Sequence, residues 1–121
     1  MAGSDITQGA GNVHIGYKAG KENEAGDYTV YIGYEADEGS LSGDYAVAIG
    51  YQAKAGNSNV SIGREAGSTG ATAANYQTLV GYRAGYDLTG DQSTFVGTVA
   101  GRGLNGRVGY YARCRQCTYR L

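Results

Sequence analysis

Stretches of three residues recur along the chain, and in each a β-branched side chain stands first and third with a variable residue between them. An alternation with a period of two is typical of a strand that buries one face. The pattern predicts that the β-branched residues face the core and that the variable residues face the other way. The β-branched pairs are Val13 and Ile15, Val30 and Ile32, Val47 and Ile49, Val60 and Ile62, Thr78 and Val80, and Thr94 and Val96.

These stretches belong to a longer internal repeat. Six segments share a frame of 12 residues with the consensus G-[DN]-Y-x-[VT]-x-[IV]-G-Y-x-A-G, whose positions we call columns. The frames span residues 9–20, 26–37, 43–54, 56–67, 74–85 and 90–101, and RVGYYAR at 107–113 reads as a degraded seventh copy. Self-similarity of this kind indicates a repeat architecture, in which each unit buries its apolar face against its neighbours.

Two further columns constrain the backbone. The eighth is always glycine, which permits a turn with positive φ or a close approach of two chain segments. The eleventh is always alanine, which indicates a narrow interior. The predicted repeat core combines these columns with the β-branched ones: Val13, Ile15, Gly16, Ala19, Val30, Ile32, Gly33, Ala36, Val47, Ile49, Gly50, Ala53, Val60, Ile62, Gly63, Ala66, Val80, Gly81, Ala84, Val96, Gly97 and Ala100.

One repeat is predicted to form a short strand, a sharp corner, a second short stretch and a loop. Stacked copies give an all-β, parallel β-roll or β-solenoid of about six short coils. The core of such a rod is thin, and the variable column is apolar too often for a face in water. Its apolar members are Tyr31, Ala48, Leu79 and Phe95. We therefore expect a second buried surface, supplied by another copy of the chain that associates in parallel about a rotation axis.

The composition narrows the class further. Glycine accounts for 22 of 121 residues, proline is absent, and large aliphatic residues are few, so a deep globular core is not expected.

The N-terminus lacks the basic and apolar regions of a secretory signal, and no apolar run could span a bilayer, so no membrane insertion is expected. Residues 1–60 carry eight acidic and three basic side chains (net −5), and residues 61–121 carry three and seven (net +4). This asymmetry favours attachment through one end.

No combination of residues indicates catalysis, so the chain is expected not to be an enzyme and to need no cofactor. The single histidine, His14, lies in a variable column without a cysteine or serine partner nearby in sequence. Acidic residues gather around the spacers, but their spacing matches no calcium-binding loop, so we interpret them as solvated loop tips and expect no metal there. They are Glu22, Glu24 and Asp27; Glu35, Asp37 and Glu38; and Asp87 and Asp91.

Tyrosine dominates two columns, which stacked coils would turn into aromatic ladders. The third column holds Tyr28, Tyr45 and Tyr76, and the ninth holds Tyr17, Tyr34, Tyr51 and Tyr82. We favour packing against a neighbouring coil or chain, because tyrosine suits half-buried positions. The alternative is that the ninth column forms a binding stripe for a carbohydrate, such as a glycan on a host surface.

The C-terminal segment departs from the repeat. Cys114 and Cys117 form a C-x-x-C pair, which is only a weak metal candidate because a zinc site needs four ligands. Copies related by a rotation axis would bring their cysteines near that axis, so a shared metal or interchain disulfides stay open. The segment is basic, and we expect it to dock onto an acidic surface of another protein rather than onto nucleic acid. Its arginines are Arg102, Arg107, Arg113, Arg115 and Arg120.

The phrases AVAIGYQAKAG and NVSIGREAG resemble the head repeats of trimeric autotransporter adhesins, whose motif is close to N-S-V-A-I-G-x-x-A-x-A. The resemblance covers about residues 9–101 and implies a left-handed parallel β-roll assembled as a tight trimer. The variant IGYxAG is similar to repeats in tail fibres and other virion proteins of bacteriophages. The tyrosine that follows the glycine in this chain favours that second group.

The expected organisation is a lead-in at 1–8, β-roll repeats at 9–101 and a basic cap or docking tail at 102–121. The expected function is that of a structural or attachment module of a bacteriophage particle, such as a tail fibre or a decoration protein on the virion. Two alternatives stay open. One is a fragment of a bacterial adhesin head that binds cell-surface glycans or matrix, and the other is a self-assembling extracellular filament.

Overall fold

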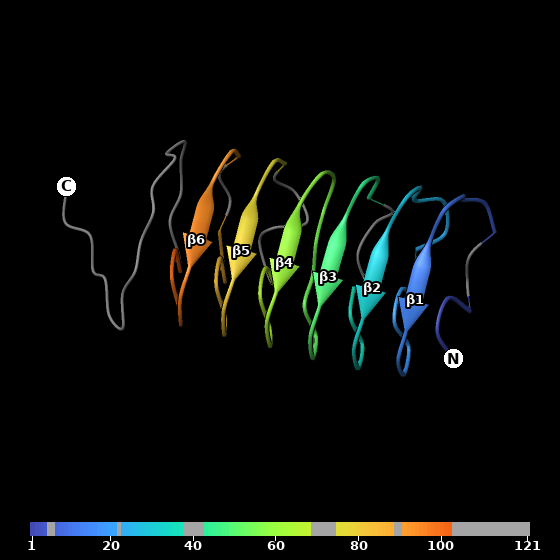
Figure 1. Cartoon of the computed structure of the whole chain (residues 1–121), viewed down its shortest axis with the longest axis horizontal. Coiled ribbons are helices and arrows are strands. Elements are labelled where there is room, and N and C mark those ends of the chain that lie inside the picture. The colour runs from blue at the N-terminus through green and yellow to red at the C-terminus, as the bar shows by residue number, and fades with distance from the viewer. Residues whose placement is uncertain (5–6, 22, 38–42, 69–74, 89–90, 103–121) are drawn as a thin grey trace.

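The computed structural model describes residues 1–4, 7–21, 23–37, 43–68, 75–88 and 91–102. This part of the chain contains six strands, one per frame: β1 (Val13–Ile15), β2 (Val30–Ile32), β3 (Val47–Ile49), β4 (Val60–Ile62), β5 (Thr78–Val80) and β6 (Thr94–Val96). They form one parallel sheet in chain order, with a coil of the chain between each strand and the next (Figure 1). The predicted all-β parallel solenoid is confirmed.

Like columns stack on like columns throughout the sheet. Val30 of β2 pairs with Val47 of β3, and Ile32 pairs with Ile49; the other neighbouring strands keep the same register. The backbone ladder continues beyond the strands into the corners, where the Gly50 amide donates to the Ile32 carbonyl at 2.8 Å. Although each strand has only three residues, backbone hydrogen bonds outside the strands also join each coil to the next.

The prediction of which strand face is buried was wrong. The variable middle residues Tyr31, Ala48, Ser61, Leu79 and Phe95 are only 0–4% exposed. The β-branched residues lie on the opposite face, and Val13, Ile15, Ile62 and Val96 are 36–57% exposed. Those assigned to the core from the sequence but found on this outer face are Val13, Ile15, Val30, Ile32, Val47, Ile49, Val60, Ile62, Val80 and Val96.

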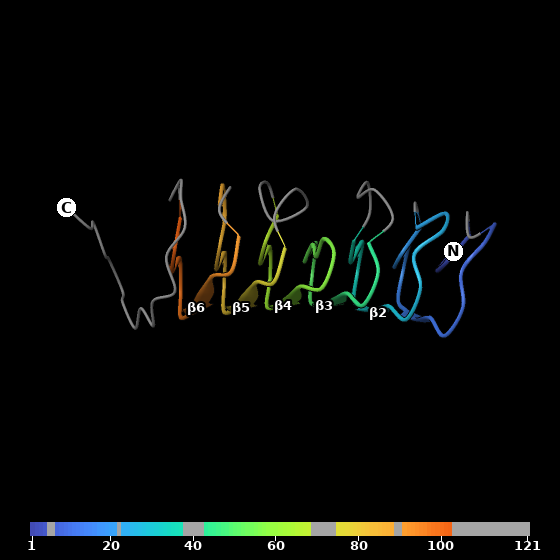
Figure 2. The same ribbon diagram turned by 90° about the horizontal axis from the view of Figure 1, so that it is seen from above.

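The buried face is opposite to the predicted one because of the side of the sheet over which the chain runs from one strand to the next. Figure 2 shows the coils rising from the strand edge on one side only, so no described segment of the chain covers the other face of the sheet. The return segments pass over the middle residues, which makes that side the interior. Alternation with a period of two is the same for either choice of buried face.

Three columns fill the interior. The middle residues pack against the alanine column, with Tyr31, Ala36 and Ala53 in one cluster and Leu79, Ala84 and others in a second. The fourth column supplies buried polar side chains that bond to the next coil, as where the Asn59 Oδ1 accepts a hydrogen bond from the Gln77 amide at 2.8 Å. Such bonds offset the cost of burying amide side chains.

The glycine of the eighth column marks the tightest backbone contact. Gly50 has φ of 135°, and a Cβ placed there would lie 2.6 Å from the carbonyl oxygen of Gly63 in the next coil. No side chain fits at that distance without displacing backbone. Both uses of glycine considered from the sequence, positive φ and close approach, therefore apply at the same position.

Candidate interaction surface

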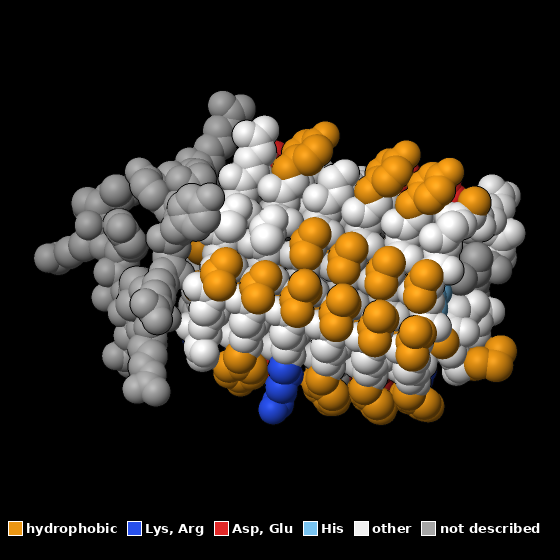
Figure 3. Space-filling view, viewed as in Figure 1, with side chains coloured by type: hydrophobic (Ala, Val, Ile, Leu, Met, Phe, Trp, Pro, Cys, Tyr) orange, Lys and Arg blue, Asp and Glu red, His pale blue; other side chains and the backbone are white. Residues whose placement is uncertain are grey.

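The outer face of the sheet is apolar, and no segment among the described residues packs over it. Its two β-branched columns run side by side along the rod, and Figure 3 shows hydrophobic side chains in rows on this face. One rim of the face carries the third-column tyrosines, which come just before each strand, and the other carries the ninth-column tyrosines, which come just after. We call the whole surface, rims included, the strand face. Its width therefore covers the strand and both corners.

The ninth column forms a continuous stack. The rings of Tyr17 and Tyr34 are 5.0 Å apart, and those of Tyr34 and Tyr51 are 5.3 Å apart, both nearly parallel. The guanidinium group of Arg64 replaces a ring in the next coil and lies 5.5 Å from the centroid of Tyr51 and 5.7 Å from that of Tyr82. Because neighbours cover most ring faces, the column presents mainly ring edges and hydroxyl groups, whereas a sugar stacks on an open ring face.

The third column stacks in the same way on the opposite rim. The rings of Tyr28 and Tyr45 are 5.5 Å apart with an angle of 10° between their planes. Tyr28, Tyr45 and Tyr76 have φ of 56–60°, a left-handed backbone conformation that non-glycine residues rarely adopt. In the sequence, the glycine at the same position of the first frame, Gly11, was the one hint of this conformation.

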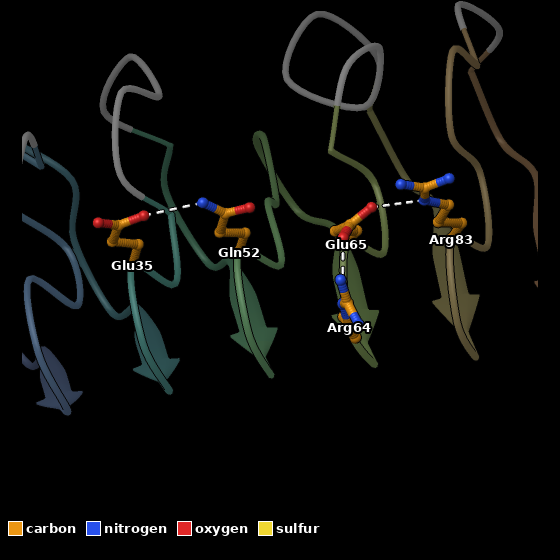
Figure 4. A network of polar contacts seen from close by, with 5 residues as sticks. All are labelled: Glu35, Gln52, Arg64, Glu65 and Arg83. Atoms are coloured by element: carbon orange, nitrogen blue, oxygen red, sulfur yellow. Dashed lines mark hydrogen bonds and ion pairs between the residues drawn. The ribbon is translucent and has the colours of Figure 1, made fainter.

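The tenth column, which the sequence analysis treated as variable, forms a charged ladder beside the ninth. Glu35 lies 3.6 Å from the Lys18 ammonium group and accepts a hydrogen bond from Gln52 at 2.8 Å. Glu65 accepts from the guanidinium groups of Arg64 and Arg83 (Figure 4). Opposite charges or hydrogen-bonding partners thus follow one another from coil to coil, which helps to fix the register of the stack.

The same contacts shift the acidity of two carboxyl groups. The hydrogen bond from Arg83, strengthened by the charges of both arginines, lowers the pKa of Glu65 below its ordinary value of 4.5. The hydrogen bond from Gln52 does the same to the pKa of Glu35, with a smaller contribution from Lys18. Each carboxylate is therefore held in its charged form by the folded chain.

Acidification is expected to destabilise the solenoid through these groups. Because the pKa of Glu65 is lower in the folded chain than in the unfolded chain, its contribution is complete above pH 4.5 and is lost as the pH falls through the folded-state value. Thermal unfolding midpoints measured from pH 7 downward should fall below that point. The Glu65→Gln variant should show a shallower fall, and an equal fall in both proteins would contradict this role.

The interpretation of the acidic residues as solvated loop tips was wrong for Asp37. This residue is fully buried, and its Oδ1 accepts a hydrogen bond from the Ala55 amide at 3.1 Å.

The other candidates from the sequence are structural or lie outside the described residues. His14 sits in the first coil, stacked on Tyr31 at 4.9 Å and hydrogen-bonded to Thr29 at 3.0 Å, and burial lowers its pKa. Asp27 and Asp44 form a side-chain ladder, since the Asp44 Oδ1 accepts from the Asp27 amide at 3.0 Å. No group of three or more potential metal ligands occurs within the described ranges.

Of the predicted docking tail at 102–121, the structure describes only the first residue, Arg102. Arg102 is exposed and lies over the ring of Tyr86 at 5.8 Å. The other candidates of the C-terminal segment and the degraded seventh copy lie outside the described residues. These candidates are Arg107, Arg113, Arg115, Arg120, Cys114 and Cys117. Two of the acidic residues, Glu22 and Glu38, also lie outside the described residues.

The fold and this surface define the chain as a parallel β-solenoid with one apolar face left open. Comparison with protein-family models, with curated proteins and with solved structures finds no match for the chain. Among the described residues there is no helix that could span a lipid bilayer. The strand face is therefore the feature of the molecule from which a function is inferred.

Proposed function

We propose that the chain is a non-enzymatic structural and attachment module of a bacteriophage particle, built as a homotrimer of parallel rods. The observation that carries this proposal is the open strand face. Soluble monomers rarely expose contiguous apolar patches larger than a few hundred Å². A face of two β-branched columns between two tyrosine columns, continuous over six strands, favours a protein partner.

A second and a third copy fit this face by simple geometry. The third and ninth columns are six residues apart, so at about 3.3 Å per residue the rims are separated by at most about 20 Å. Three such faces arranged as a triangular prism have their common axis about 6 Å from each sheet. Packed sheets normally lie about 10 Å apart, which leaves about 5 Å for the side chains of each. Valine and isoleucine therefore fill such a prism without a large void.

The role on a virion follows from rigidity and from the resemblance of the IGYxAG repeats to phage proteins. A rod whose coils are joined by backbone ladders at several corners is stiff enough to hold an attachment site at a distance from the particle. In the sequence, the arginines that begin at Arg102 make the C-terminal segment basic, suited to an acidic surface on another virion protein. A host glycan is a further candidate partner.

Immunogold labelling tests the virion assignment. Antibodies raised against the recombinant chain should label phage particles released from a bacterial culture that carries the gene, and labelling should disappear when the gene is disrupted. Label confined to the surface of the bacterial cells would favour the adhesin alternative. Label along particle-free fibres would favour the filament.

A further inference from the structure

The two tyrosine columns lie on opposite rims of the strand face. Within the described residues, ring stacking runs along each rim, from Tyr28 to Tyr45 on one side and from Tyr17 through Tyr34 to Tyr51 on the other. The strand and both corners separate the two columns of one coil. Within one coil, the tyrosine ring on one rim therefore does not touch the ring on the other rim.

The two columns are nevertheless matched coil by coil. The second, third and fifth frames have tyrosine in both columns: Tyr28 with Tyr34, Tyr45 with Tyr51, and Tyr76 with Tyr82. The fourth and sixth frames have tyrosine in neither, with Ser58 and Arg64 in one and Gln92 and Thr98 in the other. Only the first frame, with Gly11 and Tyr17, departs from this rule.

A contact between copies gives this matching a physical cause. When three flat faces close into a prism with parallel axes, the third-column rim of each copy meets the ninth-column rim of the next at every corner. Each coil of one copy then lies beside the same coil of the neighbouring copy. A pair of tyrosines meets in the second, third and fifth coils, and the long side chain of Arg64 meets the small side chain of Ser58 in the fourth.

We infer that the two tyrosine columns are the two halves of one seam, in which the third-column rings of one copy pack in register against the ninth-column rings of the next. This inference rests on the proposed assembly of parallel copies and names the residues that hold its corners. It also accounts for the exposure of the rings, which remain 37–66% accessible in a single chain.

The size of the surface agrees with a second copy as the occupant. At about 200 Å² for a full tyrosine side chain, the rings of either rim expose on the order of 350 Å². A stable protein interface buries about 800 Å² on each partner, so the valine and isoleucine columns have to supply the rest of each interface. A second copy also has the same rise per coil, so it meets every ring with an equivalent ring.

Chemical cross-linking tests the seam. In a background with Cys114→Ser and Cys117→Ser, the double variant Tyr45→Cys/Tyr51→Cys is treated with a short bismaleimide and analysed on a denaturing gel. The expected product is a covalent trimer of three times 12.6 kDa, because each corner then joins two chains. Each single variant should stay monomeric on the gel, since like rims do not meet.

A register control uses cysteines in different coils. The variant Tyr28→Cys/Tyr82→Cys places the two groups three strands apart, about 14 Å along the rod, and should give little cross-linking. Tyr28→Cys/Tyr34→Cys repeats the matched pair in the second coil and is used if the first pair impairs folding.

Three results would overturn the seam. Covalent dimers from the single variants would show that like rims meet, as in an antiparallel arrangement. A double variant that light scattering shows to be trimeric, but that fails to cross-link at either matched pair, would leave the trimer in place and remove the seam. A sample that is monomeric in solution would remove the proposed assembly together with the seam.

Discussion

Replacing Ile49 by aspartate is expected to convert the proposed trimer into a folded monomer. Ile49 lies at the centre of the strand face, in β3, and is not buried within its own chain. Three carboxylates brought together in a dry interior could not all stay charged without a large desolvation cost. The solution mass should therefore fall from three times 12.6 kDa to 12.6 kDa, while the far-ultraviolet circular dichroism spectrum stays unchanged.

A matched change away from the face provides the control. Glu24 is exposed in the spacer between the first two frames, so Glu24→Lys also alters a surface charge but leaves the strand face intact. Its mass should equal that of the wild-type protein. An Ile49→Asp protein that keeps the wild-type mass would show that the strand face is not the interface. One that unfolds would contradict the expectation that the single chain folds without its partners.

The second large effect is expected inside the coils. Leu79 is fully buried and packs with Ala84, Leu88 and Phe95, so Leu79→Ala should lower the free energy of unfolding by about 2–5 kcal/mol. Val80 follows it in β5 but lies on the outer face, so Val80→Ala should cost under about 1 kcal/mol. Both are measured by urea unfolding in the Ile49→Asp background, where the chain is tested by itself.

The comparison is decisive for the orientation of the strands. The two residues are adjacent, and Leu79→Ala removes one carbon atom more than Val80→Ala, which accounts for about 0.8 kcal/mol. A difference in cost well above that value therefore reports which face is buried. A larger cost for Val80→Ala than for Leu79→Ala would restore the orientation predicted from the alternation alone and would contradict the structure.

The repeat frame predicted the strands and their parallel stacking because each column has to meet its own copy in the next coil. It did not predict which face is buried, because alternation has no direction. A signal for the direction was present in the twelfth column. Gly20, Gly85 and Gly101 leave room for His14, Leu79 and Phe95, since a Cβ at each glycine would lie 2.5–2.6 Å from the middle side chain of the same frame.

The elements of the candidate surface were predictable to different degrees. The tyrosine columns were visible as repeated letters, and the structure shows them as stacked rings. The charged ladder of the tenth column was not visible in the sequence, because Glu35, Gln52 and Glu65 look unrelated until the coils bring them into one row. Complementary rather than identical residues held that column together, and a consensus does not reveal complementarity.

The central claim is that three copies close their strand faces around one axis. The most direct test is the solution mass of the wild-type chain, measured by light scattering coupled to size-exclusion chromatography over a range of concentrations. We predict three times 12.6 kDa, independent of dilution over that range. A stable, well-behaved species of 12.6 kDa would contradict the account, because the valine and isoleucine columns would then face water.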